Sequence, residues 1–354
     1  MNEDDHLTRE LHSAGRVEWV DCAKGLGILL VIFGHGIYGN PPEEVLRAML
    51  YSFHMPLFFI LSGVTYRCSR SPEEFCNKTI KAVKRLLLPA LGCFAVYLIE
   101  NVRHIPGLIT NPQFWSGSLY TLIFSSATYS TFLDKNVAPL GTPWFFFVLF
   151  SGRVIFDAVR LHYSEKQAVI LAWVFSLSGV IAGTVGRMPF SLDIALAVQP
   201  FFCLGNSIRK GDQAKMFSWK NLLLSALLWQ LLLWITWPDR SVWSYMELAD
   251  RRYPLYPLCM LGAACGSLLL CGLCKHISDH FFKLTTPLRY VGKNSLYLLV
   301  IHSVDYVWSP HLPLEDNLFL KSLRLIVVDL LILVLFLAGK RLFVRVRTLH
   351  ASAS

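Results

Sequence analysis

The chain has 354 residues, of which 54% are hydrophobic and 16% are charged, and its formal net charge is +9 at pH 7. Soluble domains usually carry about 25% charged residues, and the apolar runs here recur almost to the end of the chain. This pattern excludes a soluble protein with a single anchor and predicts an integral membrane protein. In such a protein the positive charge is explained by basic cytoplasmic loops and does not indicate nucleic-acid binding.

Ten stretches are long and apolar enough to cross the ~30 Å hydrocarbon core as helices. We therefore expect an all-α fold, a polytopic membrane protein with about ten transmembrane helices. The predicted spans are 19–38, 47–66, 80–100, 142–160, 166–185, 190–208, 218–237, 254–274, 287–306 and 319–339. The polar stretch 101–141 is not predicted to span, although SLYTLIFSSATYSTFL within it is compatible with an interfacial or re-entrant helix.

Lysine and arginine are dense and sparse in alternate loops. A cytoplasmic N-terminus puts most of them on the cytoplasmic side, as expected for a multi-pass protein of the inner or plasma membrane. We expect both termini in the cytoplasm and three parts: a cytoplasmic segment over 1–18, a transmembrane domain over 19–339 and a basic tail over 340–354. The first segment is charged and lacks a cleavable signal pattern.

The first predicted span contains three ionisable residues, which are costly in a bilayer and are therefore functional candidates. Asp21, Lys24 and His35 fall within about 60° of one another at 100° per residue, so they share one helix face. Asp21 and Lys24 are close enough to pair, although both positions also suit the headgroup level. His35 lies about 24 Å along the helix, in the outer part of the membrane.

Two further histidines are expected at a similar depth. His54 lies near the outer start of YSFHMPLFFILSG, and His302 lies near the outer end of LRYVGKNSLYLLVIHS. One intramembrane histidine is commonly a satisfied hydrogen-bonding residue. Three at one level favour a proton-transfer site, provided that their helices are adjacent.

Basic residues gather at the cytoplasmic start of the third span, in KTIKAVKRLLLP. Lys81 and Arg85 are four residues apart on one helix face, and Lys84 flanks them. Ordinary positive-inside flanking explains such a cluster, and the functional alternative is a cradle for a phosphorylated cytosolic ligand.

The nine cysteines lie mostly in or beside apolar spans, where cysteine behaves as a small hydrophobe. Cys271 and Cys274 form a CxxC pair, but no second such pair or histidine pair completes a metal set. We therefore expect no metal.

Six segments, in their order and spacing, resemble the acyltransferase-3 family of integral membrane acyltransferases, and more closely its fucose 4-O-acetylase-like branch. They are RVEWVDCAKGLGILLVIFGH, FHMPLFFILSG, IKAVKRLLLPA, GTPWFFFVLF, FFCLGNSI and YVGKNSLYLLVIH, and they extend from Arg16 to His302. The resemblance implies about ten helices and transfer of an acetyl group from cytosolic acetyl-CoA to a sugar hydroxyl of a cell-surface or exported glycan.

The resemblance also implies roles for particular residues. The catalytic histidine of the family falls on His35, and an arginine eleven residues earlier falls on Lys24, which keeps the charge but not the bidentate fork. The Arg-x-x-x-Arg motif of the family is only partly matched, by Lys81 and Arg85. The residues expected to carry catalysis are His35, His54, His302 and Asp21, and those expected to bind coenzyme A are Lys24, Lys81, Lys84 and Arg85. The expected partners are acetyl-CoA, a glycan or lipid-linked sugar acceptor and the lipid bilayer, with no nucleic acid.

Two alternatives stay open at this point. The first is a transporter or flippase for a glycan or small molecule, in which the histidines form a proton relay. No internal repeat is evident in the sequence, which weighs against it. The second is a membrane sensor or scaffold whose chemistry has degenerated.

Overall fold

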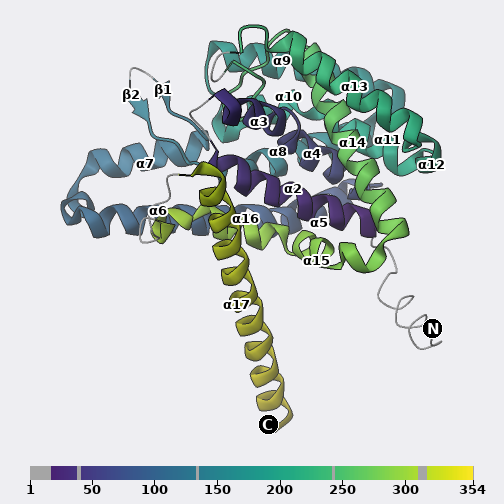
Figure 1. Ribbon diagram of the computed structural model, residues 1–354. Helices are drawn as coiled ribbons and strands as arrows, with labels where there is room; N and C mark the ends of the chain where they lie inside the picture. Colours follow the sequence, from purple (N-terminus) through teal and green to yellow (C-terminus); the bar gives the residue numbers. More distant parts are fainter. Residues whose placement is uncertain (1–16, 38–40, 133–134, 241–243, 310–316, 354) are drawn as a thin grey trace.

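The computed structural model describes residues 17–37, 41–132, 135–240, 244–309 and 317–353. Figure 1 shows the helices packed into one bundle, from which the C-terminal part of α17 projects. The longer helices are α2 (Glu18–Gly36), α6 (Leu88–His104), α8 (Trp144–His162), α9 (Glu165–Val185), α13 (Trp219–Thr236), α14 (Leu258–His280) and α17 (Leu318–Ala353). The shorter α-helices are α3 (Pro41–Tyr51), α4 (His54–Thr65), α5 (Pro72–Ala82), α7 (Pro112–Phe124), α10 (Leu192–Ala197), α11 (Gln199–Lys210), α12 (Gln213–Met216), α15 (Phe282–Lys293) and α16 (Ser295–Ser303). One π-helix, η1 (Val83–Leu87), and three 3-10 helices, η2 (Pro106–Thr110), η3 (Pro189–Ser191) and η4 (Asp305–Val307), complete the helical elements.

The fold is all-α as predicted, and the described residues add to it one short antiparallel hairpin. Its strands are β1 (Ser130–Phe132) and β2 (Lys135–Val137). The hairpin and α7 share the stretch for which an interfacial or re-entrant helix was considered. The helix stops because Ser125 adopts the left-handed conformation, with φ of 47°, and this ends the helical hydrogen-bond pattern.

Each predicted span falls on one helix or on consecutive helices. Within the described ranges, seven helical segments are long and apolar enough to cross a membrane, or eight if the bent pair α10 and α11, with η3, counts as one span. The other two predicted spans differ for physical reasons. α8 contains the charged residues Arg153, Asp157 and Arg160, and the helix over 282–303 is interrupted at Asn294. The count of about ten and the cytoplasmic termini stay predictions.

The second predicted span is broken between α3 and α4. Pro56 has no N–H group for the carbonyl of Ser52, and its ring would clash with that carbonyl in a continuous helix. The helix is accordingly interrupted at Ser52 and Phe53 and resumes at His54.

Helices α2 and α15 pack with their backbones in close contact. A Cβ atom added to Gly25 would lie 2.0 Å from a backbone oxygen of α15, and one added to Gly292 would lie 1.7 Å from the backbone oxygen of Asp21. Only residues without a side chain permit this approach. An ion pair of 3.0 Å between Arg289 and Glu18 extends the contact. The start of α2 contacts α15, and His35 at the end of α2 contacts His302 at the end of α16, so α2 runs parallel to the segment formed by α15 and α16.

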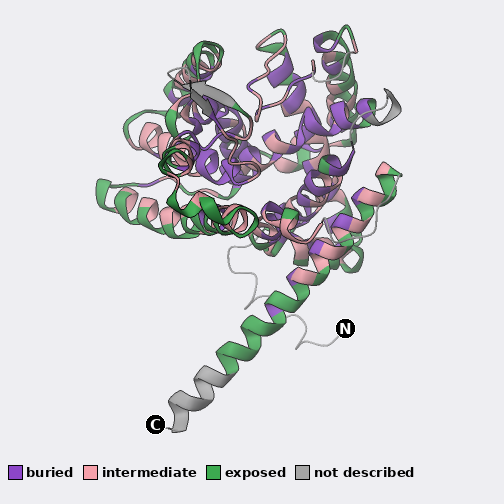
Figure 2. Ribbon diagram, turned by 90° about the vertical axis from the view of Figure 1, so that its left-hand side faces the viewer, coloured by how far each residue is buried: buried purple, intermediate pink, exposed green. Residues whose placement is uncertain are grey.

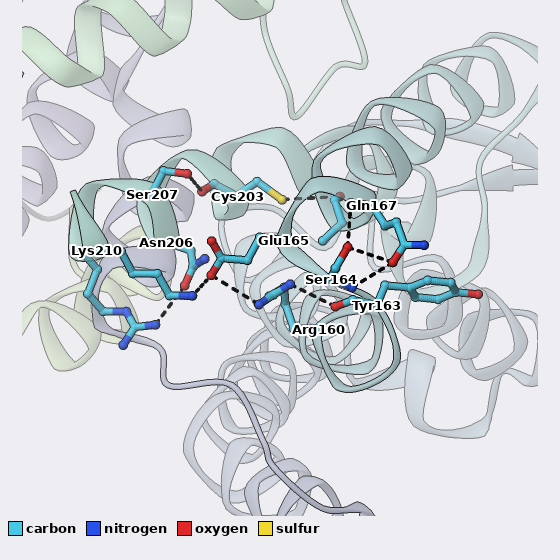
Figure 3. A network of polar contacts seen from close by, with 11 residues as sticks. Arg160, Tyr163, Ser164, Glu165, Gln167, Cys203, Asn206, Ser207 and Lys210 are labelled. Atoms are coloured by element: carbon cyan, nitrogen blue, oxygen red, sulfur yellow. Dashed lines mark hydrogen bonds and ion pairs between the residues drawn. The ribbon is translucent and has the colours of Figure 1, made fainter.

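A polar network fixes the end of the bundle where α8, α9 and α11 meet (Figure 3). Glu165 at the start of α9 forms ion pairs with Arg160 of α8, at 3.5 Å, and with Lys210 at the end of α11. The Ser164 side chain accepts a hydrogen bond from the backbone N–H of Gln167, which completes a capping box. Exposed ion pairs contribute little one by one, but together with the cap they order the turn that follows α8.

The last helix, α17, is longer than a membrane span requires. Its 36 residues correspond to about 54 Å, compared with the ~30 Å hydrocarbon core. Its first part packs against the bundle, where Ser322, Asp329 and Leu333 are buried, whereas residues 338–345 are exposed (Figure 2). The helix continues without interruption across the predicted boundary between residues 339 and 340.

Candidate functional site

One cavity runs along α2 inside the bundle, with about 920 Å³ of empty space when its open mouth is included. The α2 residues that line it are Asp21, Lys24, Ile28, Val31 and His35, spaced three or four residues apart. This spacing defines one face of the helix. The face predicted from the sequence to carry Asp21, Lys24 and His35 is therefore the face that borders the cavity.

Four basic side chains line the cavity towards the start of α2. They are Lys24, Arg85 of the π-helix η1, Arg153 of α8 and Lys293 at the end of α15. Arg153 also donates a hydrogen bond from Nε to the Ser62 hydroxyl at 2.7 Å. In the sequence, Arg153 and Lys293 count only as charges of the predicted cytoplasmic side, since the packing of separate helices brings them to the cavity.

The predicted basic cluster of the third span is divided by the structure. All three side chains are exposed, but only Arg85 lines the cavity, and Lys81 and Lys84 are not among its lining residues. The π-helix explains the separation, because a π-turn contains an additional residue. The four-residue spacing of an α-helix therefore does not place Lys81 and Arg85 on one face here. Wide turns of this kind are frequent at functional sites.

His35 lines the cavity at the other end of this α2 face and contacts His302. His35 Nδ1 and His302 Nε2 are 3.0 Å apart. His302 is 3% exposed, and its Nδ1 lies 3.1 Å from a carboxylate oxygen of Asp329 and 3.3 Å from one of Asp305. A continuous chain of hydrogen-bonding groups thus runs from the cavity through two imidazoles to two carboxylates.

His54 belongs to a different set of contacts. Its Nδ1 donates a hydrogen bond to the Leu50 carbonyl at 2.8 Å, and its ring packs edge-on against Tyr51 with centroids 4.7 Å apart. Tyr51 in turn lies 6.4 Å from the His35 ring. His54 is buried and is not among the residues that line the cavity. Of the three histidines expected together, the structure brings His35 and His302 into contact, whereas His54 is linked to His35 only through the ring of Tyr51.

Asp21, which was predicted with the catalytic group, lies at the other end. It is buried, it lines the cavity beside Lys24, and its backbone contacts Gly292. Its distance from His35 is fourteen residues along α2, or about 21 Å.

The carboxylates beside His302 were not singled out from the sequence. Asp329 lies inside the predicted span 319–339 and is fully buried. The signal that points to it is the one applied to the first span, an ionisable residue within an apolar segment. Asp305 follows His302 by three residues, close enough to reach it from η4.

The walls between the two ends of the cavity are largely apolar. They include Phe58 of α4, Trp144 and Phe145 of α8, and Leu296 and Leu299 of α16. A long, mostly apolar passage with a basic end and an imidazole suits a ligand with an anionic head and an extended arm.

Comparison with known proteins identifies the family. A family model described as an acyltransferase domain matches residues 17–340. The chain belongs to the acyltransferase-3 family. This confirms the resemblance carried by the six sequence segments, and the cavity is the candidate active site of a membrane acyltransferase.

Two curated relatives are named nodulation protein NolL. That of Sinorhizobium fredii is 27% identical over 246 residues, which cover 64% of this chain and 59% of the relative. That of Mesorhizobium japonicum is 27% identical over 220 residues, which cover 59% and 51%. The matched region therefore spans little more than half the length of these relatives. No solved structure gives a significant match.

Proposed function

We propose that the protein transfers an acetyl group from cytosolic acetyl-CoA to a hydroxyl group of a cell-surface or exported glycan. The observation that carries the proposal is the single cavity that joins four basic side chains to the His35–His302 pair. Membership in an acyltransferase family supports the reaction class.

The basic end of the cavity is suited to the phosphates of the donor. Lysine and arginine bind phosphate through charge-assisted hydrogen bonds, and Lys24, Arg85, Arg153 and Lys293 converge from four elements. With the start of α2 on the cytosolic side, as the positive-inside rule predicts, this end opens to cytosolic acetyl-CoA. Lys24 and His35 are about 16 Å apart along α2, so the arm of the donor would have to extend through the apolar passage.

His35 is suited to act as the general base. Its imidazole would remove the proton of the acceptor hydroxyl while the oxygen attacks the thioester carbonyl carbon. The carbon–sulfur bond then breaks, the acetyl group remains on the sugar, and the thiolate of coenzyme A takes the proton from the His35 imidazolium. His302, in contact with His35, orients the imidazole.

The proposal gives three predicted residues no direct part in the reaction. His54, Lys81 and Lys84 do not line the cavity. Asp21 is assigned to the basic end, where a buried carboxylate orders neighbouring cations, because it lies about 21 Å from His35 along the helix.

The test replaces His35 with alanine and follows [14C]acetyl-CoA in membranes of the native host. We expect incorporation of label into the envelope glycan fraction to fall at least 100-fold, the scale of losing a general base. His162→Ala is the matched control, because His162 is exposed and is not among the residues that line the cavity. Incorporation at the wild-type rate in His35→Ala membranes would remove His35 from the mechanism.

Consumption of acetyl-CoA by the purified protein separates this proposal from transport. A transporter that uses the histidines as a proton relay consumes none. An absence of consumption, in the presence of envelope glycan and with a correctly folded protein, would favour the transporter over the transferase.

A further inference from the structure

Asp329 is an acidic residue of α17 with a single hydrogen-bonding partner among the described residues. Its side chain is fully buried, and its Oδ2 lies 3.1 Å from His302 Nδ1. Its other oxygen, Oδ1, is buried without a hydrogen-bond partner in the described part of the chain. A buried carboxylate is costly unless a partner donates a hydrogen bond to it or carries an opposite charge. The position of Asp329 is therefore explained by His302 alone.

Hydrogen-bond chemistry then determines which nitrogens carry protons. An ionised carboxylate accepts hydrogen bonds only, so His302 Nδ1, which faces Asp329 and Asp305, must carry a proton. In neutral His302 the other nitrogen, Nε2, is an acceptor, and it accepts from His35 Nδ1 at 3.0 Å. His35 Nε2 is then left with a free lone pair.

We propose that Asp329 is a positioning residue that fixes both imidazoles in the tautomers required for His35 to act as a base. This inference rests on the proposed function, because it assigns Asp329 to the same reaction. Asp329 holds the proton on His302 Nδ1, His302 Nε2 holds the proton on His35 Nδ1, and the lone pair of His35 Nε2 is available to the acceptor hydroxyl.

The same chain gives the proton a stable place during the reaction. When His35 Nε2 takes the hydroxyl proton, His35 Nδ1 can pass its own proton to His302 Nε2. The positive charge then lies on His302, whose Nδ1–H faces two carboxylates. The transfer reverses when the thiolate of coenzyme A recovers a proton from His35 Nε2, so that no proton is gained or lost.

The two carboxylates are not equivalent. The side chain of Asp305 is 20% exposed and its oxygen lies 3.3 Å from His302 Nδ1, whereas that of Asp329 is fully buried and closer. Water competes with Asp305 for its hydrogen bonds and screens its charge. Asp329 therefore makes the larger contribution to the orientation of His302.

The kinetic test compares Asp329→Asn with Asp305→Asn, using [14C]acetyl-CoA and host membranes. Asparagine keeps the shape but offers an N–H group as well as a carbonyl, so His302 is no longer confined to one tautomer. We expect kcat to fall about 10²- to 10³-fold in Asp329→Asn, with an unchanged KM for acetyl-CoA. The fold-loss of kcat in Asp305→Asn should be at least ten times smaller than that in Asp329→Asn. Asp329→Glu, which keeps the charge, recovers part of the loss. The exposed Asp279→Asn is the matched control and keeps the wild-type kcat. Equal kcat values for Asp329→Asn and Asp279→Asn would overturn the inference.

A second measurement does not depend on turnover. Solid-state 15N NMR of histidine-labelled protein in lipid reports which ring nitrogens carry protons. We expect His35 Nε2 to be unprotonated and His302 Nδ1 to be protonated in the wild type, and this pattern to change in Asp329→Asn. Identical spectra of the two proteins would refute the inference even if acetyl transfer is confirmed. If the spectra are as expected but no acetyl transfer is detected, the proposed function is refuted and the tautomer assignment is retained.

Elemental analysis of the purified protein provides a third test of the inference. The ligand atoms of His302, Asp305 and Asp329 lie within 4.8 Å of one another and would fit around a divalent cation. A cation bound to His302 Nδ1 would force the His302 proton onto Nε2, which would then donate to His35 Nδ1. The proton of neutral His35 would lie on Nε2, and this nitrogen could no longer act as a base. Stoichiometric zinc or manganese in the purified protein, with activity lost on chelation, would therefore contradict the inference.

Discussion

Replacing Gly292 with alanine tests whether the backbone contact between α2 and α15 sets the geometry of the cavity. The added methyl carbon would lie 1.7 Å from the backbone oxygen of Asp21. Carbon–oxygen contacts are normally no shorter than about 3.3 Å, so the two helices must separate by roughly 1.6 Å. His35 lies on α2 and His302 follows α15 in α16, so their hydrogen bond of 3.0 Å would stretch beyond the usual limit of about 3.2 Å.

The expected magnitudes follow from this displacement. A misplacement of about 1 Å at a catalytic group costs about 10²-fold in rate, so we expect kcat to fall about 100-fold. Overpacking costs about 1–3 kcal/mol, and exchange of glycine for alanine in a helix returns about 1 kcal/mol. The net loss of unfolding free energy is therefore about 0–2 kcal/mol, small enough for the variant to fold.

The assay combines thermal unfolding in detergent with [14C]acetyl transfer in membranes. Gly92→Ala is the matched control, because Gly92 lies in α6 and an added Cβ atom would meet nothing within 4 Å. It has the same gain in helix propensity without the clash, so its kcat should equal that of the wild type. If Gly292→Ala behaves like Gly92→Ala in both measurements, the contact does not control the site.

Three other variants probe the donor site, the histidines and the loop before α14. Lys293→Ala should raise the KM for acetyl-CoA about tenfold through loss of a charge-assisted hydrogen bond, whereas the control Lys81→Ala should leave this KM unchanged. Equal KM values for the two variants, measured from initial rates, would exclude Lys293 from donor binding. His54→Phe should lower the melting temperature but keep kcat within about threefold of the wild type, unlike His35→Ala, because His54 is not among the residues that line the cavity. Burial, aided by a neighbouring carboxylate, raises the pKa of Glu247 from 4.5 to about 7. The folded protein therefore holds this proton more tightly than the unfolded chain, and the stability gained from it below about pH 4.5 is lost as the pH rises through 7. Melting temperatures at pH 5 and pH 8 should differ less in Glu247→Gln than in the wild type, and an equal difference in both proteins would contradict this assignment.

The sequence was most informative where the relevant geometry is local. Asp21, Lys24 and His35 were predicted to share one face of the first helix, and all three line the cavity. The helical period alone determines this arrangement, because each residue turns the side-chain direction by about 100°. The order and spacing of the six segments likewise identified the family, which the match over residues 17–340 confirms.

The remaining features depend on contacts between distant segments. Arg153 and Lys293 reach the cavity, and Asp329 reaches His302, only because the fold brings α8, α15 and α17 to the region of α2, and no local period encodes that packing. The prediction for Lys81 assumed a regular α-helix, and the π-turn over 83–87 changes the direction of the side chains beyond it. Both cases mark the limit of arguments from spacing in a single chain segment.

The parallel packing of α2 against α15 and α16 has a consequence for the choice of donor. Each side of this pairing carries a cation followed by a histidine: Lys24 and His35 on α2, and Lys293 at the end of α15 and His302 in α16. The glycine contact prevents one from sliding along the other without steric conflict, so the distance between the basic end of the cavity and His35 is fixed; under the proposed function this is the distance between the donor phosphates and the general base. A donor with the same phosphates but a shorter arm would hold its thioester short of His35. The protein would thus select its donor by length as well as by charge.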